Sequence, residues 1–386
     1  MVKTRLYTPD VKLVLVASFF FLMSPMLINP VIAGFATNVG ASSALAGLIA
    51  GLTNLTSLVL RPLAGNLTDR VSKYHLTLVG ACLLLLASLG YGLTNNLSLI
   101  MAFRILNGVG YTLCSVCMAT WMASLLPPDR IGSGMGIYGL ANALGMACGP
   151  AISVFLYQHY SYHSVFWLAA IFSGLLVVMI QFVSDRGVPV ARPQTTGQSR
   201  RIRIIAPTVL PVAMILLLFS LPYFATQTYI VSYVATRHFH VAAGVFFPVY
   251  AIILLVMRLV LRDLFDRVPF RKFIWLCLGC NLVGLIGLTD MTNWLMLVVG
   301  ALGLAAGYGL MFSICQAKAM MLVSVADHGL ANSTFYIGVD LGMSLGPIIG
   351  GLISSALPMA WFYPVMMVMT LPLIIIVYLF NRKGLA

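Results

Sequence analysis

Two charged residues stand inside long apolar stretches of the chain. Asp340 lies in the run Ile-Gly-Val-Asp-Leu-Gly, and Arg104 lies in the run Ala-Phe-Arg-Ile-Leu. A charge among apolar side chains is costly, and it usually marks an ion or proton pathway or a structural ion pair. We predict that Asp340 binds and releases a proton; the alternative is an ion pair with Lys318. Arg104 is predicted to couple to a protonated carboxylate, to contact a substrate anion, or to tie neighbouring helices.

Other polar side chains are sparse in the apolar stretches. On a helix, residues seven and eleven positions apart share a face, so Tyr111 and Ser115 are expected on the Arg104 face, flanked by Asn107. Such a face should look into a cavity rather than into lipid. The predicted substrate-cavity residues are Asn29, Asn54, Asn107, Tyr111, Asn142, Gln227, Tyr250 and Tyr336.

The composition requires that these residues sit in a membrane protein. Of the 386 residues, 61% are hydrophobic and only 8% are charged, too few to cover a soluble protein of this size. The net charge of +13 is therefore not read as a sign of nucleic-acid binding. Runs such as 82–88 do not alternate in polarity, which excludes a β-barrel.

Apolar stretches long enough for a membrane helix occur twelve times. They fall at 11–35, 44–64, 75–94, 98–125, 134–158, 163–183, 207–234, 241–261, 272–289, 293–323, 330–356 and 360–380. The first is too long for the apolar core of a signal peptide and is read as a retained span. The sequence thus predicts an all-α membrane protein with twelve transmembrane helices.

Basic residues mark one set of loops. Lys and Arg gather before the first span, after spans two, four, six and eight, and at the end of the chain, whereas the opposite loops hold only Arg237. Because cytoplasmic loops carry the excess of Lys and Arg, both termini are predicted to be cytoplasmic. The net positive charge is then a consequence of topology.

The chain contains an internal repeat. With an offset of 197, Arg61 maps onto Arg258, Asp69-Arg70 onto Asp266-Arg267, and Gly110-Tyr111 onto Gly307-Tyr308. A glycine-proline pattern repeats too: Gly145, Gly149 and Pro150 map onto Gly342, Gly346 and Pro347. We predict six-helix halves at 1–183 and 207–386, joined by a polar cytoplasmic linker at 184–206. Two parallel halves of this kind are typical of transporters that alternate around a central site.

Three motifs make the chain resemble the major facilitator superfamily over essentially its whole length. Residues 61–70, RPLAGNLTDR, resemble the family signature between helices 2 and 3, with a weaker copy at 258–267. Residues 104–110, RILNGVG, resemble the helix-4 signature with its embedded arginine. The resemblance implies a cytoplasmic latch in which Asp69 faces the positive end of a helix in the other half. The latch residues are Arg61, Gly65, Asp69, Arg70, Arg258, Asp266 and Arg267.

The third motif is a glycine-proline pattern. Gly145, Gly149 and Pro150 resemble the helix-5 antiporter signature, although Ser153-Val154 stands where Gly-Gly is usual. The complete form occurs at Gly342, Gly346 and Pro347 with Gly350-Gly351. In helix 11, glycines recur every four residues, which lets a neighbouring helix approach closely. We expect these residues to serve in helix packing and as hinges.

The resemblance favours a proton-coupled antiporter that exports a drug or metabolite. A proton symporter that imports a sugar or organic acid is the first alternative, and a transport-inactive receptor or lipid-handling protein is the second. No ATP-binding motif, catalytic constellation or set of metal ligands is evident, so neither an enzyme nor a cofactor is expected. The expected partners are a small-molecule substrate, protons and the lipid bilayer, with no nucleic acid, for a monomer in the cytoplasmic membrane.

Overall fold

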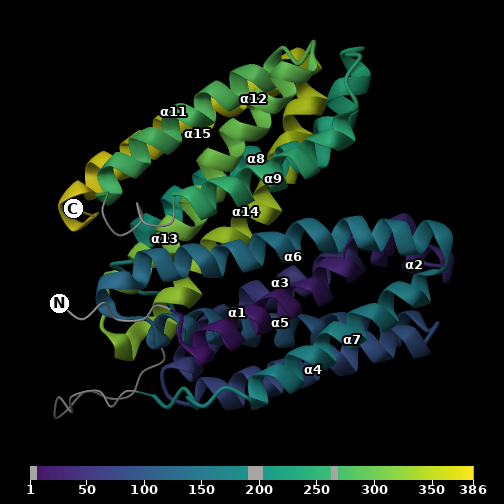
Figure 1. The fold of residues 1–386 in the computed structure, drawn as a ribbon. Coiled ribbons are helices and arrows are strands. Elements are labelled where there is room, and N and C mark those ends of the chain that lie inside the picture. The colour runs from purple at the N-terminus through teal and green to yellow at the C-terminus, as the bar shows by residue number, and fades with distance from the viewer. Residues whose placement is uncertain (1–6, 190–202, 262–267, 386) are drawn as a thin grey trace. The chain divides into compact units, whose positions relative to one another are not determined.

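The computed structural model describes residues 7–189, 203–261 and 268–385. Within these ranges, twelve helical segments are long and apolar enough to cross a membrane, and no strand occurs. The predicted twelve-span, all-α fold is confirmed. The helices that form the spans are α1 (Pro9–Ile28), α2 (Ile32–Asn38), α3 (Ser43–Thr68), α4 (Lys73–Leu93), α5 (Leu97–Leu125), α6 (Ile131–His159), α7 (Tyr162–Gln181), α8 (Leu210–Thr236), α9 (Phe246–Val260), α11 (Phe270–Thr289), α12 (Trp294–Leu304), α13 (Leu310–Met321), α14 (His328–Ala356) and α15 (Phe362–Leu385) (Figure 1).

Two of the spans contain a break. The first span is α1 followed by the short α2, and the helix stops at Asn29 because Pro30 has no backbone N–H to donate. The tenth span is α12 and α13 joined by one π-helical turn, Ala305–Gly309. Such single π-helical turns occur frequently at functional sites.

Most of the chain falls into two compact units. Unit 1 is Met1–Arg130, Ala141–Ile205 and Val323–Ser333; unit 2 is Ile131–Leu140, Ala206–Leu322 and Thr334–Ala386. Unit 1 therefore comes mainly from the predicted first half and unit 2 from the second. The exchanged segments are the first turns of α6 and the turns at the start of α14, which the 197-residue offset relates to each other. Much of the predicted linker, 190–202, lies outside the described residues.

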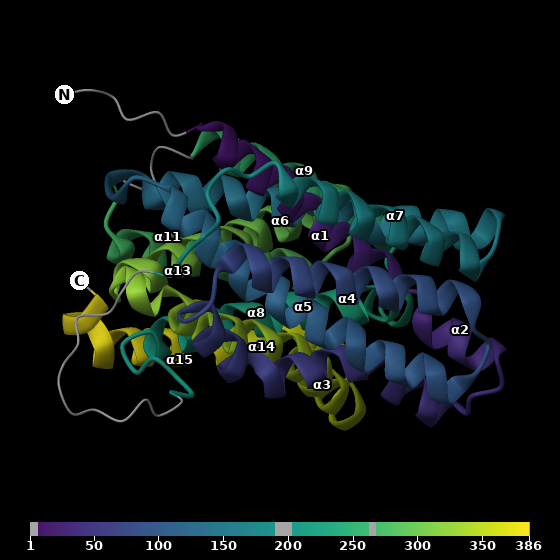
Figure 2. The same ribbon diagram turned by 90° about the horizontal axis from the view of Figure 1, so that it is seen from below.

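In unit 1, α4 packs against α5 and α7, and α7 also packs on α1 (Figures 1 and 2). In unit 2, α11 packs on α12 and α15, while α8 packs on α15 and α13. Small residues permit these close approaches. A Cβ on Gly284 would lie 2.7 Å from the Cα of Gly303, so α11 and α12 touch backbone to backbone.

In each unit, the predicted packing glycines lie against the side chains of one neighbouring helix. Gly145 and Gly149 of α6 lie against Leu22 and Met26 of α1. Gly342 and Gly346 of α14 lie against Ser220 and Phe224 of α8. Pro150 and Pro347 follow these glycines inside their helices.

Candidate functional site

The carboxylate of Asp69 caps the first turn of α14. Asp69 is the C-terminal cap of α3, and its Oδ1 accepts from the amide of Gly329 at 2.6 Å, while Oδ2 accepts from Leu330 at 3.1 Å. The first amides of a helix have no partner inside the helix and form a partial positive charge, so an anion is stabilised there. Both sides of this contact belong to unit 1.

Helices α3 and α14 approach each other closely around this cap. A Cβ on Gly65 would lie 2.6 Å from the Cβ of Ser333 and 2.9 Å from the carbonyl oxygen of Gly329. The hydroxyl of Ser333 donates to the carbonyl of Arg61, and the side-chain amide of Asn332 donates to Thr120 Oγ1 at 3.0 Å. Glycine at position 65 is therefore required by the close approach of α3 and α14.

The other predicted latch residues lie in different settings. Arg70 is exposed at the end of α3, whereas Arg61 is fully buried: it donates to Ser115 Oγ and lies over the Tyr111 ring at 5.5 Å. Arg258 is buried in unit 2 and donates to the carbonyl of Gly309 at 2.7 Å. Asp266 and Arg267 lie outside the described residues.

Arg104 holds three parts of unit 1 together. Its Nε donates to the carbonyl of Ile49 at 3.0 Å, one terminal nitrogen donates to the carbonyl of Ala50 at 2.6 Å, and both terminal nitrogens reach Asn29 Oδ1 at 3.3 and 3.4 Å. These partners come from α3 and from the break between α1 and α2. Of the roles that the sequence left open for Arg104, these contacts provide the tie between neighbouring helices. Tyr111 and Ser115, which were expected beside Arg104, contact Arg61.

Asp340 is buried in the middle of α14, with 2% of its surface exposed. One turn earlier, the hydroxyl of Tyr336 accepts from Gln316 of α13 at 3.3 Å. The ammonium of Lys318 lies 5.8 Å from the centre of the Phe270 ring. All of these residues belong to unit 2.

The predicted cavity residues divide between the units. Asn29, Asn54, Asn107, Tyr111 and Asn142 lie in unit 1, and Gln227, Tyr250 and Tyr336 lie in unit 2. Among the described residues, neither side-chain amide atom of Asn107 has a hydrogen-bond partner, although the side chain is fully buried. Gln227 is exposed and donates to the hydroxyl of Tyr223 at 2.9 Å. Tyr250 and Tyr223 lie with their ring centres 4.9 Å apart.

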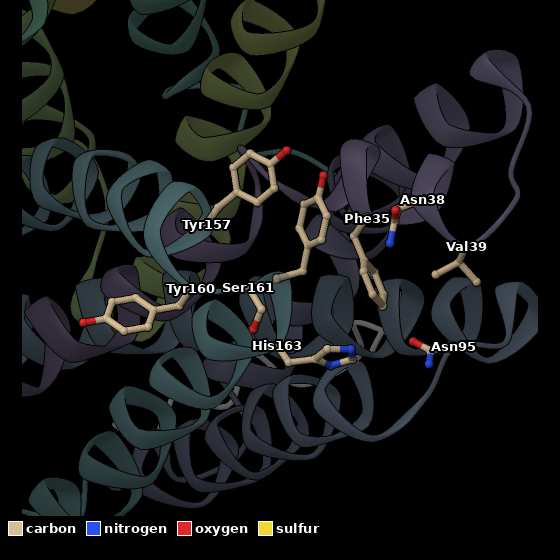
Figure 3. A pocket seen from close by; sticks show the side chains of 9 residues that line it. Phe35, Asn38, Val39, Asn95, Tyr157, Tyr160, Ser161 and His163 are labelled. Carbon is tan, nitrogen blue, oxygen red and sulfur yellow. The ribbon is translucent and has the colours of Figure 1, made fainter.

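A separate pocket of about 600 Å³ lies at one end of unit 1 (Figure 3). Its wall is formed by Phe35, Asn38, Val39, Asn95, Tyr157, Tyr160, Ser161, Tyr162 and His163. These residues come from loops and from the ends of helices in unit 1. None of the predicted proton-coupling or cavity residues lines it.

Sequence reasoning missed Tyr223 and Ser313, and it noted Tyr308 only as a landmark of the repeat. All three lie around Arg258. For Tyr308 the available signal was the repeat itself, because the 197-residue offset leads to it from Tyr111, whose ring lies beneath Arg61.

Comparison with known proteins gives sequence relatives along most of the chain. It is 25% identical over 348 residues to the uncharacterized MFS-type transporter YhhS of Escherichia coli K12, covering 88% of this chain and 84% of that protein. It is 22% identical over 381 residues to the staphylopine export protein of Staphylococcus aureus, covering 92% and 91%.

Solved structures share the fold. The human organic anion transporter MFSD10 superposes with a TM-score of 0.74 at 15% identity, covering 95% of this chain and all of that one. The proton:xylose symporter XylE superposes with a TM-score of 0.72 at 13% identity, covering 98% and 95%. The family model of the Major Facilitator Superfamily matches residues 14–291 and 264–385. The chain therefore belongs to the Major Facilitator Superfamily of membrane transporters and is not an enzyme.

Proposed function

We propose that the chain is a proton-coupled secondary transporter that exports a small organic molecule by alternating access. The observation that carries the proposal is Asp340, a carboxylate buried in the middle of an apolar helix. The other described aspartates lie at helix ends or in loops. A buried carboxylate in a membrane helix is costly, and proton relays are a main reason for keeping one. The similarity to the staphylopine export protein supports the direction of transport.

The same helix joins Asp340 to the Asp69 cap. Gly329 and Asp340 are eleven residues apart on α14, which is about 16 Å along the helix axis. A change of charge at Asp340 that shifts α14 therefore acts directly on the first turn that Asp69 holds. The proposal is that proton binding at one end of this segment and capping at the other favour different conformations of the transporter.

Reconstitution in liposomes tests the proposal. With an imposed pH gradient, movement of a transported solute against proton flow is expected for the wild type and is expected to lose its dependence on the gradient in Asp340→Asn. Asp290→Asn is the matched control, because Asp290 is exposed at the end of α11. Full proton-linked transport by Asp340→Asn would exclude this carboxylate as the proton carrier.

Other outcomes separate the alternatives. Solute that moves only together with the inward proton flow would make the protein a symporter. Absence of any solute movement across a broad panel would favour a receptor or lipid-handling protein. The proposed setting is the cytoplasmic membrane, with both termini inside and the monomer as the working unit.

A further inference from the structure

Arg258 of α9 is a buried cation whose hydrogen bonds are incomplete. Only 3% of the residue is exposed, and one terminal nitrogen donates to the carbonyl of Gly309 at 2.7 Å. Among the described residues, its Nε and its other terminal nitrogen, Nη1, have no hydrogen-bond partner. A buried donor left without a partner costs on the order of 1–3 kcal/mol, and more when it is charged. Within the described part of the chain, two donors of this buried cation therefore lack an acceptor.

The groups that surround this guanidinium are phenols. Tyr223, Tyr250 and Tyr308 are the titratable side chains that act electrostatically on Arg258 within the described part of the chain. The rings of Tyr223 and Tyr308 stack with centres 4.6 Å apart. Tyr308 and the Gly309 carbonyl both come from the π-helical turn that interrupts the tenth span. The irregular turn thus helps to form the surroundings of the arginine.

The repeat shows that this arrangement is not a general feature of the fold. Arg61, the counterpart of Arg258, donates to Ser115 and lies over Tyr111. With the 197-residue offset, Ser115 corresponds to Phe312. The second half therefore lacks the hydroxyl that accepts a hydrogen bond from the arginine of the first half. The same offset turns Met26 into Tyr223 and Thr53 into Tyr250. Both halves place the arginine near a tyrosine of the repeat, but Tyr223 and Tyr250 have no aromatic counterpart in the first half, and only Arg258 has donors without a partner among the described residues.

A second open donor lies at the same point. A Cβ on Gly139 would overlap Ser313 Oγ and would lie 3.0 Å from Nη1 of Arg258, so both groups border this glycine of α6. Ser313 is 1% exposed, and its hydroxyl also has no partner among the described residues. Gly139 belongs with unit 2, in the segment Ile131–Leu140. The start of α6 therefore covers the open donors of Arg258 and Ser313.

We propose that Arg258 and Ser313 bind the carboxylate of the transported molecule, and that Tyr223 and Tyr250 contact its apolar body. A carboxylate offers two oxygens in a plane, which match the paired N–H groups of a guanidinium, and the hydroxyl can donate a further bond. Aromatic rings supply an apolar surface that tolerates different bodies. Movement of the start of α6 away from Arg258 would open the site. This inference names the substrate class of the proposed exporter and rests on that function.

Ligand binding by the purified full-length protein tests the assignment without requiring transport. The probes are three matched sets on phenyl, naphthyl and octyl bodies: benzoate, 1-naphthoate and nonanoate, each with its primary amide and with an amine of the same body. Binding is measured from the rise of the melting temperature with ligand concentration. At least one carboxylate is expected to bind about ten- to a hundredfold more tightly than its amide or amine.

Variants locate the binding to Arg258. Arg258→Gln is expected to lose that ten- to hundredfold preference, whereas Arg237→Gln, at the exposed end of α8, should retain it. Phe312→Ser keeps Arg258 and introduces a hydroxyl at the position that corresponds to Ser115, the acceptor for Arg61. This hydroxyl should accept from an N–H group of Arg258 and thereby weaken carboxylate binding. If Arg258→Gln does not fold, the carboxylate preference of the wild type and the weaker carboxylate binding of Phe312→Ser still test the assignment.

The results that overturn the inference are distinct from those that overturn the export function. If no carboxylate binds more tightly than its amide and amine, or if Arg258→Gln binds carboxylates as tightly as the wild type, the anion assignment is wrong. Proton-linked export of amines in that case would leave the transport function standing. Carboxylate preference without proton-linked movement would support the binding site and contradict the export function.

Discussion

The carboxylate of Asp69 accepts a hydrogen bond from the backbone amide of Gly329 at 2.6 Å. These residues are separated by 260 positions in the sequence. The contact places a side chain at the end of α3 on the first turn of α14, the helix that also contains Asp340. A cap formed from a distant part of the chain can be made and broken as a conformational contact, which a cap from the neighbouring residue cannot.

Replacing Asp69 with Asn should weaken this cap. The carboxylate accepts from two amides, but the asparagine side chain has one acceptor and one donor group, so one amide loses its partner. Loss of the charge also removes the attraction to the helix end, and the sum should be about 1–2 kcal/mol. The expected results are a lower melting temperature and increased labelling of a cysteine introduced into the first turn of α14.

Asp129→Asn is the matched control for this experiment, because Asp129 is an exposed aspartate in the short 3-10 turn Pro128–Arg130. An Asp69→Asn protein with the melting temperature and labelling of the wild type would contradict a stabilising role for the cap.

Gly65→Ala should separate α3 from α14. The added methyl group would lie 2.6 Å from the Cβ of Ser333 and 2.9 Å from the Gly329 carbonyl, where no flexible group can move aside. Overpacking of this kind costs about 1–3 kcal/mol. Gly51→Ala in the same helix is the control, because a Cβ there has nothing within 4 Å. Equal melting temperatures for the two variants would show that the close approach is not required.

Arg104→Lys should lower the stability of the protein even though it keeps the positive charge. One ammonium cannot match the geometry of the guanidinium, which reaches the carbonyls of Ile49 and Ala50 together with Asn29. We expect a loss of about 1–3 kcal/mol, measured by thermal or denaturant unfolding against Arg237→Lys. If stability is unchanged and only the apparent substrate affinity falls, Arg104 contacts substrate instead of tying helices.

Gly342→Ala should disturb the packing of α14 on α8, because the new methyl group would overlap Ser220 Oγ. Changing Ser220 to Gly removes the obstructing hydroxyl and should restore much of the loss. A double-mutant cycle measures this as a coupling energy, expected at about 1–3 kcal/mol for residues in contact. Strictly additive effects of the two changes would exclude direct packing between these positions.

The outline of the fold followed from the sequence by itself. Twelve apolar stretches predicted twelve spans, since a hydrocarbon layer admits only helices or closed barrels and sets the helix length. The break after Ile28 also has a local cause in Pro30. The repeat of Gly145 and Gly149 at Gly342 and Gly346 pointed to close helix packing, because such packing needs small side chains wherever the helix lies.

Tertiary structure decided which partners the embedded charges have. The Arg104 face contains Tyr111 and Ser115, yet their side chains meet Arg61 of another helix, and Arg104 meets backbone carbonyls. Carbonyl oxygens occur at every residue, so no pattern of residue types marks those that an arginine will reach. The surroundings of the open donors of Arg258 likewise include Gly139 and Ser313, which come from separate helices. Spacing along one helix determines which residues share a face, but only the packing of helices determines what that face contacts.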